Sequence, residues 1–134
     1  MNTATEDIAL AIKDFARNTL GCGCSEDVFD KIEYTPLARA GNDITLHGRI
    51  NIGNRLLIYT VPVDDVKALF SLIPSLVLCG RNERDRNGFN RFRLVLLNQG
   101  REELPCFADS IFHSLNYIDD KTHLHIIPLE SINW

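Results

Sequence analysis

The sequence predicts an α+β fold in one domain, with a mixed β-sheet that contains a hairpin, helices packed on that sheet and a helix at the N-terminus. Two observations support this. The 134 residues are close to the commonest size of a single domain, and 45% of them are hydrophobic, enough for a core. Helical and strand patterns also alternate, and the last part reads β-α-β-α-β. With no internal repeat or linker, residues 1–134 form one predicted domain.

The first helix is predicted over residues 3–20. Thr3 and Glu6 form a capping-box pattern, which satisfies the free N–H groups at a helix start. Apolar side chains then recur at helical spacing, and Gly21 suits the left-handed conformation that ends a helix. Ser25 is a favourable N-cap, so we expect a second, short helix over residues 25–30.

Strand patterns follow. Residues 31–35 alternate between apolar and polar side chains and are closed by Pro36, and residues 37–42 read as a loop. Residues 44–52 alternate in the same way, Gly53 and Asn54 turn the chain, and residues 55–61 run back. This pattern predicts a β-hairpin.

The second half alternates helices and strands. We expect a helix over residues 64–73, an interruption at Pro74 and a second helix towards Gly88, with a short buried strand at residues 76–78 as the alternative. Residues 92–97 predict a strand buried on both faces, and residues 104–115 a helix with an apolar stripe. The last strand, residues 122–127, turns His123 and His125 to the face opposite Leu124 and Ile126.

Charge and targeting patterns limit the function classes. The net charge of −4 argues mildly against a nucleic acid partner, although residues 79–93 carry +3. The polar N-terminus has no secretory pattern, and no apolar run approaches the roughly 20 residues that span a bilayer. A cytoplasmic location is the resulting expectation, and there the four cysteines are expected as thiols or metal ligands rather than disulfides.

The most unusual stretch is Cys22-Gly23-Cys24, between the two predicted N-terminal helices. In an extended segment both sulfurs face the same side and suit zinc or another soft transition metal. A pair supplies only two ligands, and His123 and His125 are the candidates to complete a Cys₂His₂ site. A helix start after Cys24 would also lower the pKa of its thiol, which suits reversible oxidation. The alternative is a purely structural turn. Cys79 and Cys106 are also candidates to complete the site, but their apolar or proline surroundings in the sequence favour a place in the core.

A resemblance starts from the same stretch. Leu20-Gly21-Cys22-Gly23-Cys24, followed by Glu26 and Val28-Phe29, resembles the opening of a small uncharacterised prokaryotic family that carries Leu-Gly-Cys-Gly-Cys-Pro-Glu-Glu-Val-Phe after an N-terminal helix. Ser25 and Asp27 depart from that pattern, and the resemblance covers about ten residues. It implies a bacterial or archaeal cytosolic origin and no particular activity.

A second candidate site is the arginine-rich segment at residues 81–93. Its guanidinium groups, with Phe89 and Phe92 between them, suit phosphate or another anionic partner, and stacking on the phenylalanines would suit nucleic acid. The alternative is an exposed helix end with acid–base pairs to Glu83 or Asp85. The candidate anion-binding residues are Arg81, Arg84, Arg86, Arg91 and Arg93.

Three hypotheses therefore stand at the level of sequence. The first is metal binding or thiol redox chemistry through Cys22 and Cys24. The second is a non-enzymatic module that binds a protein partner or a second copy of the chain, for example through an open sheet edge. The third is anion binding through the arginines. Motifs typical of nucleotide-binding enzymes, hydrolases and metalloproteases are missing from the sequence, which leaves enzymatic activity undecided.

Overall fold

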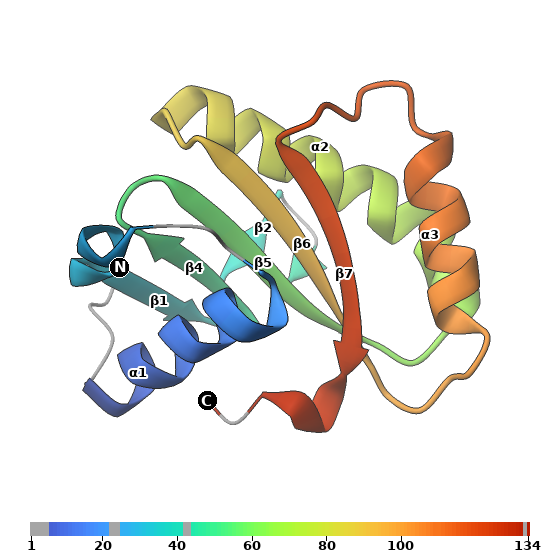
Figure 1. Ribbon diagram of the computed structural model, residues 1–134. Coiled ribbons are helices and arrows are strands. Elements are labelled where there is room, and N and C mark those ends of the chain that lie inside the picture. Colours follow the sequence, from blue (N-terminus) through green and yellow to red (C-terminus); the bar gives the residue numbers. More distant parts are fainter. Residues whose placement is uncertain (1–5, 22–24, 42–43, 133) are drawn as a thin grey trace.

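The structure is a computed structural model that describes residues 6–21, 25–41, 44–132 and 134. Its centre is a five-stranded mixed sheet with the strand order β1-β4-β5-β6-β7 (Figure 1). The strands are β1 (Ile32–Pro36), β4 (Gly48–Ile52), β5 (Leu56–Val63), β6 (Arg91–Asn98) and β7 (Thr122–Pro128). The α+β class and the mixed sheet expected from the sequence are confirmed.

The direction of the strands divides the sheet into two parts. β1, β4 and β5 are antiparallel, and the β4–β5 hairpin turns at Gly53 and Asn54, both with positive φ. β5, β6 and β7 are parallel, so a helix connects each of these strands to the next. β7 lies at one edge of the sheet, next to the almost fully buried β6.

Helices cover both faces (Figure 1). α2 (Leu69–Asn87) and α3 (Leu104–Ser114) pack on one face, in a core that includes Leu76, Phe92 and Phe112. α1 (Glu6–Asp14) and a π-helical turn, Phe15–Thr19, pack on the other face over β1, β4 and β5. A 3₁₀ turn, Leu129–Ser131, follows β7.

The interruption expected at Pro74 is wrong. A 3₁₀ turn, Val66–Ala68, leads into α2, which runs without a break through Pro74 to Gly88. Proline removes one hydrogen bond, but the acceptor is the carbonyl of the exposed Phe70, which water can satisfy. The expectation of helix rather than strand at residues 76–78 is confirmed. Gly88 closes the helix in the left-handed conformation at φ 74°.

The single strand expected over residues 44–52 is two strands. β3 (Ile44–Thr45) pairs with β2 (Arg39–Ala40), inside the segment expected as a loop, and β4 pairs with β1 and β5. The change of partner falls at Leu46 and His47. Gly48 lies against the Tyr34 ring, where a Cβ atom would come within 2.5 Å of Cε1.

The N-terminal segments differ in detail from their prediction. The first helix ends as a π-helical turn, and Gly21 has the expected positive φ of 69°. The second helix is a single 3₁₀ stretch, Glu26–Asp30, and the Ser25 hydroxyl donates to the Asp27 carboxylate at 2.6 Å rather than capping it. Cys22 and Cys24 lie outside the described residues, as does Thr3 of the predicted cap.

Candidate oxyanion site

Two arginines of β6 and two histidines of β7 share one face of the sheet. Side chains alternate along a strand, and the odd-numbered Val95, Leu97 and Ile127 pack in the core on the α1 side. The other odd-numbered residues near the start of both strands face the same way. They form the Arg–His cluster, which consists of Arg91, Arg93, His123 and His125.

Hydrogen bonds join the two strands within the cluster. Nη1 of Arg93 lies 2.8 Å from Nε2 of His125, and Nη1 of Arg91 lies 3.5 Å from Nε2 of His123. A guanidinium group has no acceptor, so Nε2 of His125 accepts and its ring is neutral, with the proton on Nδ1. Nη1 of Arg93 also donates to the Leu20 carbonyl at 3.1 Å, at the end of the π-helical turn.

Arg93 is the unusual member of the cluster. It is only partly exposed, and none of its contacts among the described residues is to a carboxylate. Its Nε atom is buried and has no hydrogen-bond partner there. Buried charges in proteins are normally paired, and buried donors are normally satisfied. A partial charge on one carbonyl offsets little of a full positive charge.

The surroundings shift the pKa values in the same sense. Burial lowers the pKa of Arg93, and the nearby Arg91 lowers it further. Burial and the charge of Arg93 lower the pKa of His125 to about 4. Burial, Arg93 and Arg91 likewise lower the pKa of His123. At neutral pH the cluster therefore holds two guanidinium cations beside two neutral imidazoles, with capacity to take up protons if an anion arrives.

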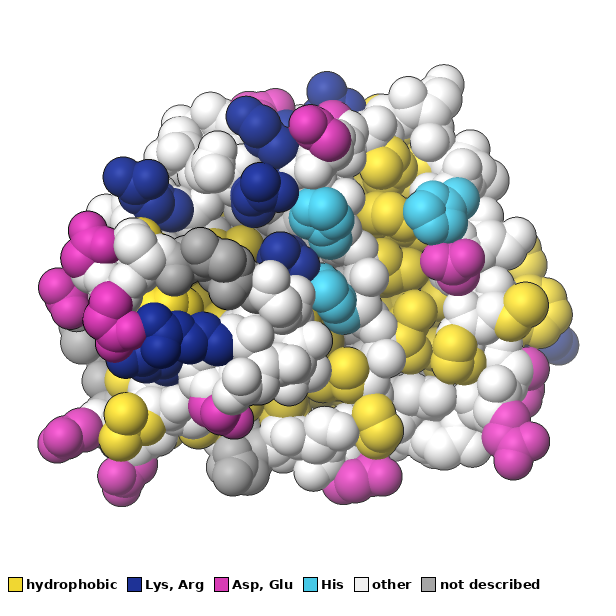
Figure 2. Space-filling model, in the orientation of Figure 1, with side chains coloured by type: hydrophobic (Ala, Val, Ile, Leu, Met, Phe, Trp, Pro, Cys, Tyr) yellow, Lys and Arg dark blue, Asp and Glu magenta, His cyan; other side chains and the backbone are white. Residues whose placement is uncertain are grey.

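Figure 2 shows the arrangement on the surface. Lys and Arg side chains gather beside histidines on the face that carries β7 in Figure 1, and an apolar area lies on the far side of the histidines. Arg55 adjoins the cluster through its backbone carbonyl, which accepts hydrogen bonds from Asn90 and Arg91. A negatively charged group that approaches this face therefore meets a basic area on one side of the histidines and an apolar area on the other.

The other three arginines of the predicted anion-binding segment lie in α2. Arg84 is 6% exposed and donates to both carboxylate oxygens of Asp119, at 3.0 and 2.7 Å, to Thr122 and to the neighbouring Asp85. Arg81 donates to the Tyr117 carbonyl at 2.6 Å. Arg86 lies in the last turn. The structure therefore separates Arg91 and Arg93 from the other predicted members.

Of the four predicted metal ligands, His123 and His125 lie among the described residues, and Cys22 and Cys24 lie outside them. His123 and His125 share a face as expected, and Leu20, two residues before Cys22, is hydrogen-bonded to Arg93 beside them. The part of the chain that the structure describes, without Cys22 and Cys24, contains no group of three or more His, Cys, Asp or Glu side chains arranged for a metal ion.

The remaining cysteines divide. Cys79 is partly buried against the core, as expected. Cys106 was expected in the core and is exposed, because α3 buries Leu104, Ala108 and Phe112, and Cys106 lies off that stripe.

One polar cluster was not predicted. Tyr59 of β5 and Arg49 of β4 both donate to the carboxylate of Glu83 in α2, and all three are largely buried. Burial, together with Glu83, raises the pKa of Tyr59. No sequence pattern links the three, since Glu83 lies 24 residues from Tyr59. The charges are compensated within the cluster, which fits a role in fixing α2 to the sheet.

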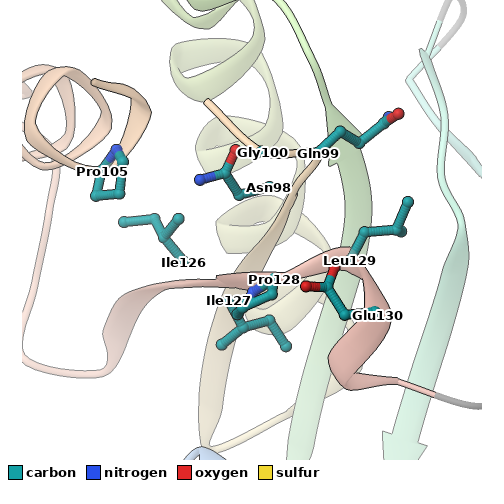
Figure 3. Close-up of a pocket in the computed structure, with 9 residues that line it drawn as sticks. All are labelled: Asn98, Gln99, Gly100, Pro105, Ile126, Ile127, Pro128, Leu129 and Glu130. Carbon is teal, nitrogen blue, oxygen red and sulfur yellow. The ribbon is translucent and has the colours of Figure 1, made fainter. Parts of the chain in front are cut away.

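A hollow of about 620 Å³ lies at the carboxyl ends of β6 and β7 (Figure 3). Ligands of α/β sheets often bind at this end of parallel strands. Its side chains are mostly apolar or exposed, and Glu130 is the one charged residue among them. The lining residues are Asn98, Gln99, Gly100, Pro105, Ile126, Ile127, Pro128, Leu129 and Glu130. Glu130 is exposed, so the hollow lacks the partly buried charge that marks the Arg–His cluster, and the cluster remains the stronger candidate.

Comparisons with known proteins add no assignment. Protein-family models, curated proteins and solved structures were each compared with the chain, and none matched. Among the described helices, none combines the length and the apolar character needed to cross a bilayer. The functional argument therefore depends on the chemistry of the cluster itself.

Proposed function

We propose that the protein binds an oxyanion, a carboxylate or phosphate group, at the Arg–His cluster. The observation that supports this is the partly buried guanidinium of Arg93, which has no carboxylate partner among the described residues and a buried Nε–H without an acceptor. An oxyanion supplies both missing elements at once, a negative charge and acceptor oxygens. Arginine binds such groups in two-pronged geometry, which adds specificity to the electrostatic attraction.

Each member of the cluster has a distinct part. Arg93 is the main donor. Arg91 lies on the same face of β6 and adds a second cation, which is exposed. His125 and His123 accept from these arginines when no anion is present. An anion that draws the guanidinium groups towards itself frees the imidazole nitrogens, and its negative charge raises their pKa values. Binding is then coupled to proton uptake, and affinity rises as the pH falls below 7.

Inorganic phosphate is the first probe. We expect isothermal titration calorimetry at low ionic strength to show saturable binding, and urea unfolding to show stabilisation. A ligand at ten times its Kd raises the free energy of unfolding by about 1.4 kcal/mol. Arg93→Gln should weaken binding at least about tenfold, because charged hydrogen bonds to an anion contribute about 1.5–3 kcal/mol.

The matched control is Arg101→Gln. Arg101 is exposed, follows the opposite end of β6 and donates to the Asp64 carbonyl, so this variant removes one positive charge without touching the cluster. If Arg101→Gln and Arg93→Gln weaken phosphate binding equally, the effect comes from the net charge of the protein, and a defined site is refuted. Absence of saturable binding of phosphate, and of acetate as a carboxylate probe, would refute the proposal altogether.

A second candidate is a soft transition metal such as zinc, or a redox-active thiol, at Cys22 and Cys24 with His123 and His125. It is favoured by the hydrogen bond from Arg93 to the Leu20 carbonyl, because Leu20 precedes Cys22 by two residues and Arg93 also contacts His125. Neutral imidazole and thiolate are suitable ligands for zinc. A metal at His125 would have to displace the guanidinium from Nε2, which counts against this candidate.

Elemental analysis of protein purified without oxygen separates the two candidates. The metal hypothesis requires near-stoichiometric zinc, iron or copper that Cys22→Ser and Cys24→Ser both remove. If the purified protein contains no metal and binds phosphate, the metal hypothesis is rejected and the oxyanion proposal is supported. The thiol variant requires a cysteine that is alkylated well below the ordinary thiol pKa of about 8.5, and an ordinary alkylation profile at both positions rejects it.

A further inference from the structure

β7 has an open edge beside the Arg–His cluster. Phe92 donates its N–H to the Lys121 carbonyl at 2.9 Å, so odd-numbered peptide groups of β7 point towards β6. Peptide groups alternate along a strand, which turns those of the even-numbered Leu124 and Ile126 to the outside. Thr122, also even-numbered, agrees with this, since its N–H donates away from the sheet to Asp119. No strand among the described residues pairs with that edge.

The edge borders two chemically different surfaces. On the α1 side lie His123 and His125, and behind them the guanidinium groups of Arg91 and Arg93, which have no carboxylate partner among the described residues. On the α3 side lies a hollow of about 310 Å³ with apolar walls from Phe112, Ile118 and Leu124, which His123 and His125 also line. It contains two carboxylates, Asp109 and Asp119.

Of these two carboxylates, Asp119 is paired with Arg84 at 2.7 Å. Asp109 is well exposed to solvent and lies 3.2 Å from the ring of His113. The side facing the cluster therefore favours a negative group, and the side facing the hollow favours an apolar one.

We propose that an extended acidic segment of a partner protein adds to the free edge of β7. Its backbone pairs with the outward peptide groups of Leu124 and Ile126, as in other complexes formed by strand addition. Its side chains alternate, with acidic residues over His123 and His125 and apolar residues in the hollow. This inference rests on the proposed oxyanion site, for which the acidic side chains supply the carboxylate.

A second copy of the chain fits the same edge less well. Two copies of β7 paired antiparallel about a two-fold axis would place both Arg–His clusters on the same side of a continuous sheet. The four arginines of the two clusters would then share one face of the sheet with no added negative charge, and like charges gathered on one surface repel each other. An acidic segment removes the excess of positive charge, whereas a second copy doubles it.

The test uses a fluorescently labelled eight-residue peptide of alternating Glu and Val. We expect saturable binding, with slower hydrogen exchange at the amides of Leu124 and Ile126. A peptide with Lys in place of each Glu should bind at least about tenfold more weakly. Arg93→Gln should weaken binding of the Glu peptide, and Arg101→Gln should not.

Two further peptides, N-methylated either at every Glu or at every Val, test the backbone pairing. They have the same composition, but methyl groups block opposite edges of an extended strand. We expect one isomer to bind like the parent peptide and the other to lose binding. Equal binding of both isomers, equal binding of the Lys peptide, or a dimer of the free protein through β7 would overturn the inference. Phosphate binding without peptide binding would overturn it too and leave the oxyanion site standing, whereas loss of both would refute both proposals.

Discussion

Arg84 and Arg93 lie nine residues apart in one basic stretch of the sequence, yet their surroundings are opposite. Two nitrogens of Arg84 donate hydrogen bonds to the Asp119 carboxylate, and one of them also donates to the Thr122 hydroxyl. Arg93 contacts a carbonyl and a neutral imidazole. The first is a completed ion pair that fastens α2 to the start of β7. The second is a cation that has no carboxylate partner among the described residues. The difference shows that the contacts of each arginine in a basic segment must be known before that arginine is assigned to ligand binding.

The largest expected effect is on stability. Arg84→Met leaves Asp119 without its main partner. Loss of one member of a buried ion pair costs about 3–5 kcal/mol, and because the Asp119 side chain is 32% exposed we expect a loss of about 2 kcal/mol. Arg93→Met removes an uncompensated cation along with two hydrogen bonds, so we expect a change of less than about 1 kcal/mol. Urea unfolding of the two variants measures both values. Equal losses, or a larger loss for Arg93→Met, would contradict the distinction.

A second effect separates the two sites by pH. The pKa of His125 is about 4 in the folded protein and 6.5 in the unfolded chain. As the pH falls, His125 therefore takes up a proton in the unfolded chain before it does so in the folded protein. Stability is complete above about pH 6.5 and declines towards pH 4. His125→Asn should reduce this decline, with His123 contributing the rest. An unchanged decline in this variant would contradict the assignment.

The Asp119 window lies lower. Arg84 holds the pKa of Asp119 well below its usual 3.8, so its stabilisation is present above about pH 3.8 and is lost as the pH falls through the folded value. Asp119→Asn should remove this acid-side loss and leave the His125 window intact. Urea midpoints measured from pH 7 to about pH 2 show whether the two windows are separate.

The smallest expected effect concerns a third kind of ion pair. Glu26 accepts hydrogen bonds from Lys13 and Arg17 on the surface, and its carboxylate is well exposed to solvent. Exposed pairs contribute little and are screened by salt. Glu26→Gln should barely move the urea midpoint at physiological ionic strength. A loss comparable to that of Arg84→Met would show that the exposure argument fails.

Much of the fold was predictable because its signals are local. The alternation of Leu124 and Ile126 with His123 and His125 fixed which side chains share a face, and Gly88 marked the end of a helix. β2 was missed, and β3 was merged with β4 into one predicted strand, because two-residue strands show no periodicity of their own. The helix break predicted at Pro74 was wrong because the cost of the missing hydrogen bond depends on whether water reaches the Phe70 carbonyl, and packing decides that.

The site was predictable only in outline. Sequence indicated that residues 81–93 are basic and that His123 and His125 point the same way. Whether Arg84 or Arg93 keeps a free charge depends on Asp119, which lies 35 residues after Arg84 and reaches it through tertiary structure. The parallel pairing of β6 with β7, which sets Arg93 beside His125, likewise has no signal in either segment alone.

The most direct test of the central claim is nuclear magnetic resonance of the arginine Nε–Hε groups during a titration with phosphate. The resonance of Arg93 should shift progressively and saturate, because its unpartnered Nε–H gains an acceptor. The resonance of Arg84 should stay in place, because both sides of its guanidinium are already occupied. An Arg93 resonance that does not move, or equal and unsaturated shifts at both arginines, would contradict the claim that Arg93 is the open cation of a binding site.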